Sequence, residues 1–178
     1  MDGNKKEEHM TSLSGKRLVS KTHGRIAFRG QIDLLEAEVI EAQVLASQLG
    51  ESVYCGYLGE ILACLRAIMT AEVKETPLKA PFLFGMSAEE IHSRSHNMAG
   101  KPLVLPDYTQ GPLAARLNTM RAKVREVELL AVKVFGPGAE ETSDINPSDF
   151  NPREDIILAL NRLSSAFWWL FCEYSEKK

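Results

Sequence analysis

The sequence lacks a cysteine framework, a strong excess of charge and an apolar run of membrane length. Its cysteines are odd in number and form no CxxC pair, so Cys55, Cys64 and Cys172 are expected to be free, buried thiols in a reducing cytoplasm. The net charge of −3 provides no general attraction for nucleic acid. No apolar run reaches the roughly 18 residues of a membrane helix, and the start of the chain lacks the apolar core of a secretion signal.

The rest of the composition is typical of one globular domain. Apolar residues make up 44% of the 178 residues and charged residues 25%, and this length suits one sizeable core, although two small ones are not excluded. Residues 1–10 are polar and are expected to be disordered. Residues 11–175 are expected to form a single helical domain.

Apolar residues recur at steps of three and four in long segments, which predicts amphipathic helices. The expected long helices span residues 26–49, 53–75, 112–135 and 152–173, and a short helix from 87 to 97 begins with the capping box of Ser87 and Glu90. No convincing strand is visible. The predicted fold class is therefore all-α, a bundle of four long helices and a short fifth, with no sheet of three or more strands.

The last predicted helix, with Asn151 as its N-cap, changes character halfway along its length. Residues 160–165 are mostly polar, whereas Ala166 to Cys172 are apolar in every direction around the helix. Since a bundle helix normally shows one side to water, a second surface is expected to cover this end. That surface is another subunit or a large ligand, or alternatively the loops at 76–111.

Several charged residues flank the predicted buried stripes and need partners. Arg121, Arg125 and Glu128 lie at i, i+4 and i+7 beside the stripe of the 112–135 helix, so the arginines need anionic partners. Taken alone, this spacing favours ion pairs with Glu128 on the helix surface over a bound anion. Asp33 lies next to the stripe of the first helix and is expected to be half-buried. Arg121 and Arg125 are its candidate partners.

A second basic cluster precedes the first helix. Its five cations suit a polyphosphate, and a solvated basic segment is the alternative. The members of the cluster are Lys16, Arg17, Lys21, Arg25 and Arg29.

His92 and His96 are spaced i, i+4, which is compatible with one metal ion on one face of the short helix. A third ligand is not evident and the glutamate of an HExxH motif is missing, so hydrogen-bonded histidines are favoured and no metal site is predicted. The sequence also contains no Ser-His-Asp order and no glycine-rich phosphate loop.

Five segments, in this order, resemble the ethanolamine-utilisation cobalamin adenosyltransferases, and two of them are also similar to the propanediol-utilisation type. They are LVSKTHGRIAFRGQID, AIMTAEVKETPL, GMSAEEIHSRSHN, LNTMRAKVRE and DIILALNRLSS. The resemblance implies transfer of the 5′-deoxyadenosyl group of ATP to Co(I) of cobalamin, with Mg²⁺, in a homo-oligomer for which a trimer is favoured over a dimer. It implies a cytoplasmic protein, with association with a microcompartment left open.

Matching by position, the resemblance implies site residues. Lys21 would contact the ATP phosphates, and Asn161 would contact the nucleotide. Of Arg121 and Arg125, one would hold triphosphate and the other would pair with Asp33 across subunits.

The resemblance leaves the cobalamin contacts open, with Phe82, Phe84 and Trp168 as candidates. Many ethanolamine-type members carry an N-terminal His and a Cys-Cys-x-x-Cys metal segment, which this sequence lacks, so a metal-free branch or a truncation is expected. Ser165 stands where the propanediol type has an aspartate. The alternative function is a non-catalytic helical scaffold subunit; an all-α nucleotide pyrophosphohydrolase is disfavoured because EExxE-like carboxylate clusters are absent.

Overall fold

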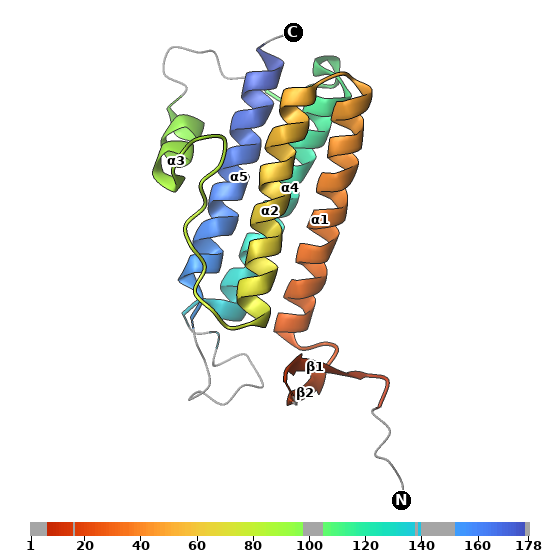
Figure 1. Ribbon diagram of the computed structural model, residues 1–178, viewed down its shortest axis with the longest axis vertical. Helices are drawn as coiled ribbons and strands as arrows, with labels where there is room; N and C mark the ends of the chain where they lie inside the picture. The colour runs from red at the N-terminus through yellow and green to blue at the C-terminus, as the bar shows by residue number, and fades with distance from the viewer. Residues whose placement is uncertain (1–6, 16, 98–104, 138, 140–151, 177–178) are drawn as a thin grey trace, which may run out of the picture.

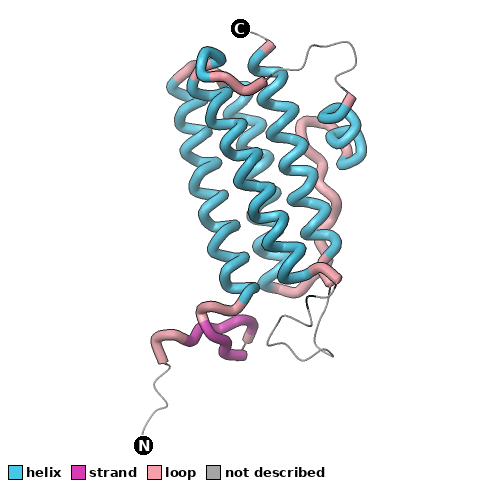
Figure 2. The backbone as a smooth tube through the Cα atoms, turned by 180° about the vertical axis from the view of Figure 1, so that it is seen from behind, coloured by secondary structure: helices cyan, strands magenta, loops and turns pink. Residues whose placement is uncertain are grey.

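Four long helices lie side by side in the computed structural model, which describes residues 7–15, 17–97, 105–137, 139 and 152–176 (Figure 1). They are α1 (Gly24–Gln48), α2 (Ser52–Val73), α4 (Pro112–Phe135) and α5 (Glu154–Ser175). The shorter α3 (Ala88–His96) packs beside α5, and the short 3₁₀ turn η1 (Tyr108–Gln110) precedes α4 (Figure 2). The predicted bundle of four long helices and a short fifth is therefore confirmed.

The apolar stripes predicted from the sequence are the faces that meet in the core. Burying each large aliphatic side chain contributes roughly 1.5–3 kcal/mol, so these stripes hold the helices together. Representative members with no exposed surface are Ile32 and Val39 of α1, Leu58 and Leu65 of α2, Leu117 and Val124 of α4, and Leu160, Leu163 and Phe167 of α5.

The helix boundaries follow local capping. The predicted capping box of Ser87 and Glu90 is present at α3, and α4 spans residues 112–135 as expected. By contrast α5 begins at Glu154 instead of residue 152, because its N-cap residue is Arg153, which makes no side-chain cap. The predicted cap, Asn151, lies outside the described residues.

A two-stranded antiparallel hairpin corrects the expectation that the chain has no strand. β1 (Met10–Ser14) pairs with β2 (Arg17–Ser20) near the start of α1 (Figure 1). The strands are short and only Leu13 is fully buried, so they carry almost no alternating pattern. Met10, which was expected to be disordered, therefore belongs to a strand, and residues 1–6 lie outside the described part of the chain. As expected, the described residues contain no sheet of three or more strands.

By length and composition alone, α2 is apolar enough to cross a membrane. This differs from the expectation that no segment of the sequence is long and apolar enough to do so. The two results differ because the mean hydropathy of an 18-residue window can stay high despite the charges of Glu60 and Arg66. The same two charges interrupt any continuous apolar run. The core helix of a globular bundle passes the same test. Here α2 packs against α1 and α5 and buries Leu58, Ile61 and Leu65 completely.

The segment between α2 and α3 covers part of the aromatic end of α5. Phe84 has a φ of 59°, unusual for a bulky residue, within a tight turn closed by backbone hydrogen bonds between Leu83 and Met86. This turn stacks the Phe84 ring on Trp169, with centroids 5.4 Å apart, and places it 4.7 Å from the ring of Tyr57. The alternative in which loop residues cover the end of α5 therefore holds for Trp169.

Candidate functional site

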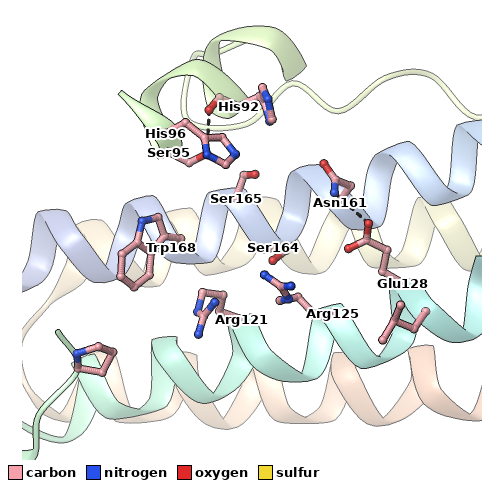
Figure 3. A pocket seen from close by; sticks show the side chains of 12 residues that line it. His92, Ser95, His96, Arg121, Arg125, Glu128, Asn161, Ser164, Ser165 and Trp168 are labelled. Atoms are coloured by element: carbon pink, nitrogen blue, oxygen red, sulfur yellow. Dashed lines mark hydrogen bonds between the residues drawn. The ribbon is translucent and has the colours of Figure 1, made fainter. Parts of the chain in front are cut away.

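A pocket of about 510 Å³ lies between α3, α4 and α5 (Figure 3). Most of its lining residues are polar, with Trp168, Leu129 and Pro106 as apolar members. The polar side chains are Arg121, Arg125 and Glu128 from α4, Asn161, Ser164 and Ser165 from α5, and His92, Ser95 and His96 from α3.

Helical spacing explains why α5 changes character halfway. Asn161, Ser164, Ser165 and Trp168 lie at i, i+3, i+4 and i+7, so they share one face of the helix, and that face lines the pocket. The opposite stripe of α5 enters the bundle core. The polar first half of the helix thus meets the pocket, and the aromatic half begins at the pocket's end with Trp168 (Figure 3).

Arg121 and Arg125 of α4 have no ion pair with any carboxylate in the described part of the chain, whereas Arg116 on the same helix pairs with Glu41. Arg121 is partly buried, its Nε donates to Asn118 Oδ1 at 3.2 Å, and its guanidinium lies 5.3 Å from the centre of the Trp168 ring. Arg125 is exposed. The alternative of surface ion pairs with Glu128 is not observed, so both guanidiniums keep donors available for an anion.

Both the nitrogen and the oxygen of the Asn161 side-chain amide form hydrogen bonds. Its Nδ2 donates to Glu128 Oε1 at 2.9 Å, and its Oδ1 accepts from Arg162 Nη1 at 2.5 Å. These contacts set the orientation of the amide at the pocket wall. Sequence reasoning missed Arg162, although it stands next to Asn161 in the segment LNRLSS, and it considered Glu128 only as an arginine partner.

Asp33 and Lys21 do not join this pocket within one chain. Both are exposed, Asp33 on α1 and Lys21 after the hairpin, and neither lines the pocket. The expectation that Asp33 is half-buried is wrong for the single chain, because its position is rotated away from the stripe containing Ile32. Among described residues Asp33 has no ion pair with Arg121 or Arg125.

The structure divides the basic cluster, of which Arg25 and Arg29 lie in the first turns of α1. Arg25 and Arg29 each donate from Nε to the buried carboxylate of Glu72 at 2.5 Å, and Arg25 also contacts Glu75 at 2.7 Å. Burial opposes the charge of Arg25, but the bonds to Glu75 and Glu72 leave its pKa raised. Two of the five expected phosphate ligands are therefore already paired, and Lys16 lies outside the described residues.

The two histidines of α3 face the pocket as a pair. Their ring centroids are 4.5 Å apart, and His92 Nδ1 is 3.5 Å from Arg162 Nη1. Loss of solvation, with the positive charges of Arg162 and His96, lowers the pKa of His92. Within the described ranges no three His, Cys, Asp or Glu side chains gather as a metal site requires.

The aromatic candidates for cobalamin differ in position. Phe82 is 68% exposed, and Phe84 packs on Trp169; neither lines the pocket. Trp168 does line it. The structure therefore brings together Arg121, Arg125, Asn161, the two histidines and Trp168, and leaves Lys21, Asp33, Phe82 and Phe84 outside.

A family model and several known proteins are similar to this chain. The family model for cobalamin adenosyltransferase matches residues 3–174. The corrinoid adenosyltransferase EutT of Salmonella typhimurium and that of Escherichia coli are each 33% identical over 171 residues, covering 92% of this chain and 58% of theirs. The chain thus spans a little over half the length of these relatives.

Solved structures share the fold. A variant of the PduO-type ATP:corrinoid adenosyltransferase from Lactobacillus reuteri, complexed with cobalamin and ATP, is 22% identical with a TM-score of 0.64, covering 95% of this chain and 91% of that one. Another variant of that protein, complexed with ATP, is 23% identical with a TM-score of 0.65 at the same coverage. The match to the family model over residues 3–174 establishes that the chain belongs to the cobalamin adenosyltransferase family.

Proposed function

We propose that this chain is an ATP:cob(I)alamin adenosyltransferase that makes adenosylcobalamin for ethanolamine utilisation. One observation carries the proposal: Arg121 and Arg125 have no carboxylate partner among the described residues and face Asn161 across one pocket. Arginines that are not neutralised within the chain suit an anionic ligand of several charges. The class of reaction is the one by which the family is named.

In the proposed reaction, Co(I) of the substrate cobalamin attacks C5′ of ATP with an electron pair. The Co–C bond forms as the C5′–O5′ bond breaks, and the triphosphate leaves with the bonding electrons. Negative charge therefore grows on the leaving oxygen, where preorganised cationic donors lower the barrier most. Arg121 and Arg125 supply such donors from one face of α4 (Figure 3).

The other pocket residues support binding of the nucleotide. The amide of Asn161, held by Glu128 and Arg162, is set to form directional hydrogen bonds with it. Mg²⁺ is expected to enter with the nucleotide, since it is usually bound through substrate phosphates and one or two carboxylates. Glu128 is the carboxylate at the pocket wall that is suited to it, and bound Mg²⁺ would neutralise phosphate charge.

We also propose a homo-oligomer, with a trimer favoured over a dimer, that resides in the cytoplasm or in association with a microcompartment. Lys21 and Asp33 lie outside the pocket of their own chain, so a site that includes them needs a second copy. The face of α1 that carries Asp33 also exposes apolar side chains, as does α4 beyond Arg125. These exposed residues are Leu34, Ile40 and Val44 on α1 and Leu129 and Val132 on α4.

The test is product formation. The protein is mixed with ATP and cobalamin under a strong chemical reductant, and adenosylcobalamin and triphosphate are quantified by chromatography. Equal amounts of both products are expected. Absence of both, with the nucleotide recovered intact, would refute the transferase and favour the non-catalytic scaffold subunit, whereas release of pyrophosphate would indicate a pyrophosphohydrolase.

A further inference from the structure

The guanidinium of Arg121 rests against an aromatic ring that belongs to another helix. It lies 5.3 Å from the centre of the Trp168 indole, within the range of a cation–π interaction. Its Nε is engaged by Asn118 at 3.2 Å. The four remaining N–H donors of the guanidinium have no acceptor in the described part of the chain, and the side chain borders the pocket (Figure 3).

The indole itself is held from the core. Trp168 stacks on Phe171, with ring centroids 5.3 Å apart and planes inclined by 23°, and Phe171 is fully buried. A chain of contacts therefore runs from a fixed core ring through Trp168 to Arg121. Arginine loses considerable rotamer freedom when a ligand fixes it, and a side chain that is already restrained loses less on binding.

We propose that Trp168 is a positioning residue that holds the Arg121 guanidinium toward the pocket, and that it thereby sets the affinity of this site for a triphosphate group. The inference deepens the proposed function and rests on it. It gives Trp168 a role different from that of an apolar wall against the corrin. Trp169, the next residue, makes no such contact, because its ring stacks on Phe84 outside the pocket.

The experiment uses inorganic tripolyphosphate as the probe, titrated calorimetrically into the full chain. Trp168→Leu removes the aromatic face and keeps an apolar side chain, so its dissociation constant is expected to rise about three- to thirty-fold. Trp168→Phe keeps an aromatic face and should restore most of the affinity. Trp169→Leu is the matched control and should bind like the wild type. In an Arg121→Met background, Trp168→Leu should have no further effect.

The inference would be overturned by wild-type protein that does not bind tripolyphosphate, by equal losses in Trp168→Leu and Trp168→Phe, or by a loss in Trp169→Leu as large as that in Trp168→Leu. A higher KM for cobalamin in Trp168→Leu with unchanged tripolyphosphate affinity would also overturn it, in favour of a corrin wall. Thermal unfolding of each variant checks the fold. Adenosylcobalamin formation by the wild type is measured separately, so the proposed function can fail while the coupling between Trp168 and Arg121 is still observed.

Discussion

Replacing Glu72 by alanine tests what the basic segment at the start of α1 does. The Glu72 side chain is 0% exposed, and the side chains of Arg25 and Arg29 that bind it are 12% and 16% exposed. Without the carboxylate, two poorly solvated guanidiniums lose their buried counter-charge, and only Arg25 keeps a second carboxylate, the exposed Glu75. Removing one partner of a buried pair costs about 3–5 kcal/mol, and for a chain of 150–250 residues this lowers the melting temperature by roughly 6–20 °C.

Glu75→Ala is the matched control, because Glu75 binds the same arginine from a side chain that is 52% exposed. An exposed pair of this kind contributes about 0–1 kcal/mol. Urea unfolding at pH 7, followed by circular dichroism, gives the free energy of unfolding of both variants. If Glu72→Ala loses no more stability than Glu75→Ala, the buried-pair reasoning is refuted, and Arg25 and Arg29 again become candidates for phosphate binding.

Three further predictions concern activity, assembly and acid stability. Arg125→Ala should lower the rate of adenosylcobalamin formation by about 10²–10³-fold with an unchanged circular dichroism spectrum, while Lys133→Ala, an exposed cation on the same helix, should stay near the wild-type rate; an active Arg125→Ala protein would contradict the assigned role. Sedimentation equilibrium at micromolar concentration should show a stable homo-oligomer, and a monomer would rule out the proposed shared site. Partial burial opposes ionisation of Asp155, but hydrogen bonds from Arg153 and the Leu78 N–H lower its pKa overall. Because the folded-state pKa is lower than the unfolded value of about 3.9, this group stabilises the fold above about pH 4 and progressively less as the pH falls further. Asp155→Asn should therefore cost more free energy of unfolding at pH 7 than at pH 3, and an equal cost at both would count against this assignment.

Some site residues could be selected from the sequence, whereas their surroundings could not. Arg121, Arg125 and Asn161 stand in segments that resemble a known family, and helical spacing places the two arginines beside a buried stripe. The partners of Asn161 were not predictable in this way. Its contact with Glu128 joins α4 to α5 over 33 positions of sequence, and it exists only because those two helices pack together.

The sequence by itself determined the helical architecture, because apolar residues at a period near 3.6 can be buried together only on one face of a helix. It did not determine the hairpin, whose strands carry a single fully buried residue, Leu13. Only the tertiary structure decided which arginines form ion pairs within the chain. Arg25 and Arg29 bind Glu72, which is 47 and 43 positions away in the sequence, because α1 packs on α2. Helix geometry alone points the two adjacent tryptophans about 100° apart, but only the tertiary packing decided what each ring meets. One indole thus reaches the pocket and Arg121, and the other stacks under Phe84.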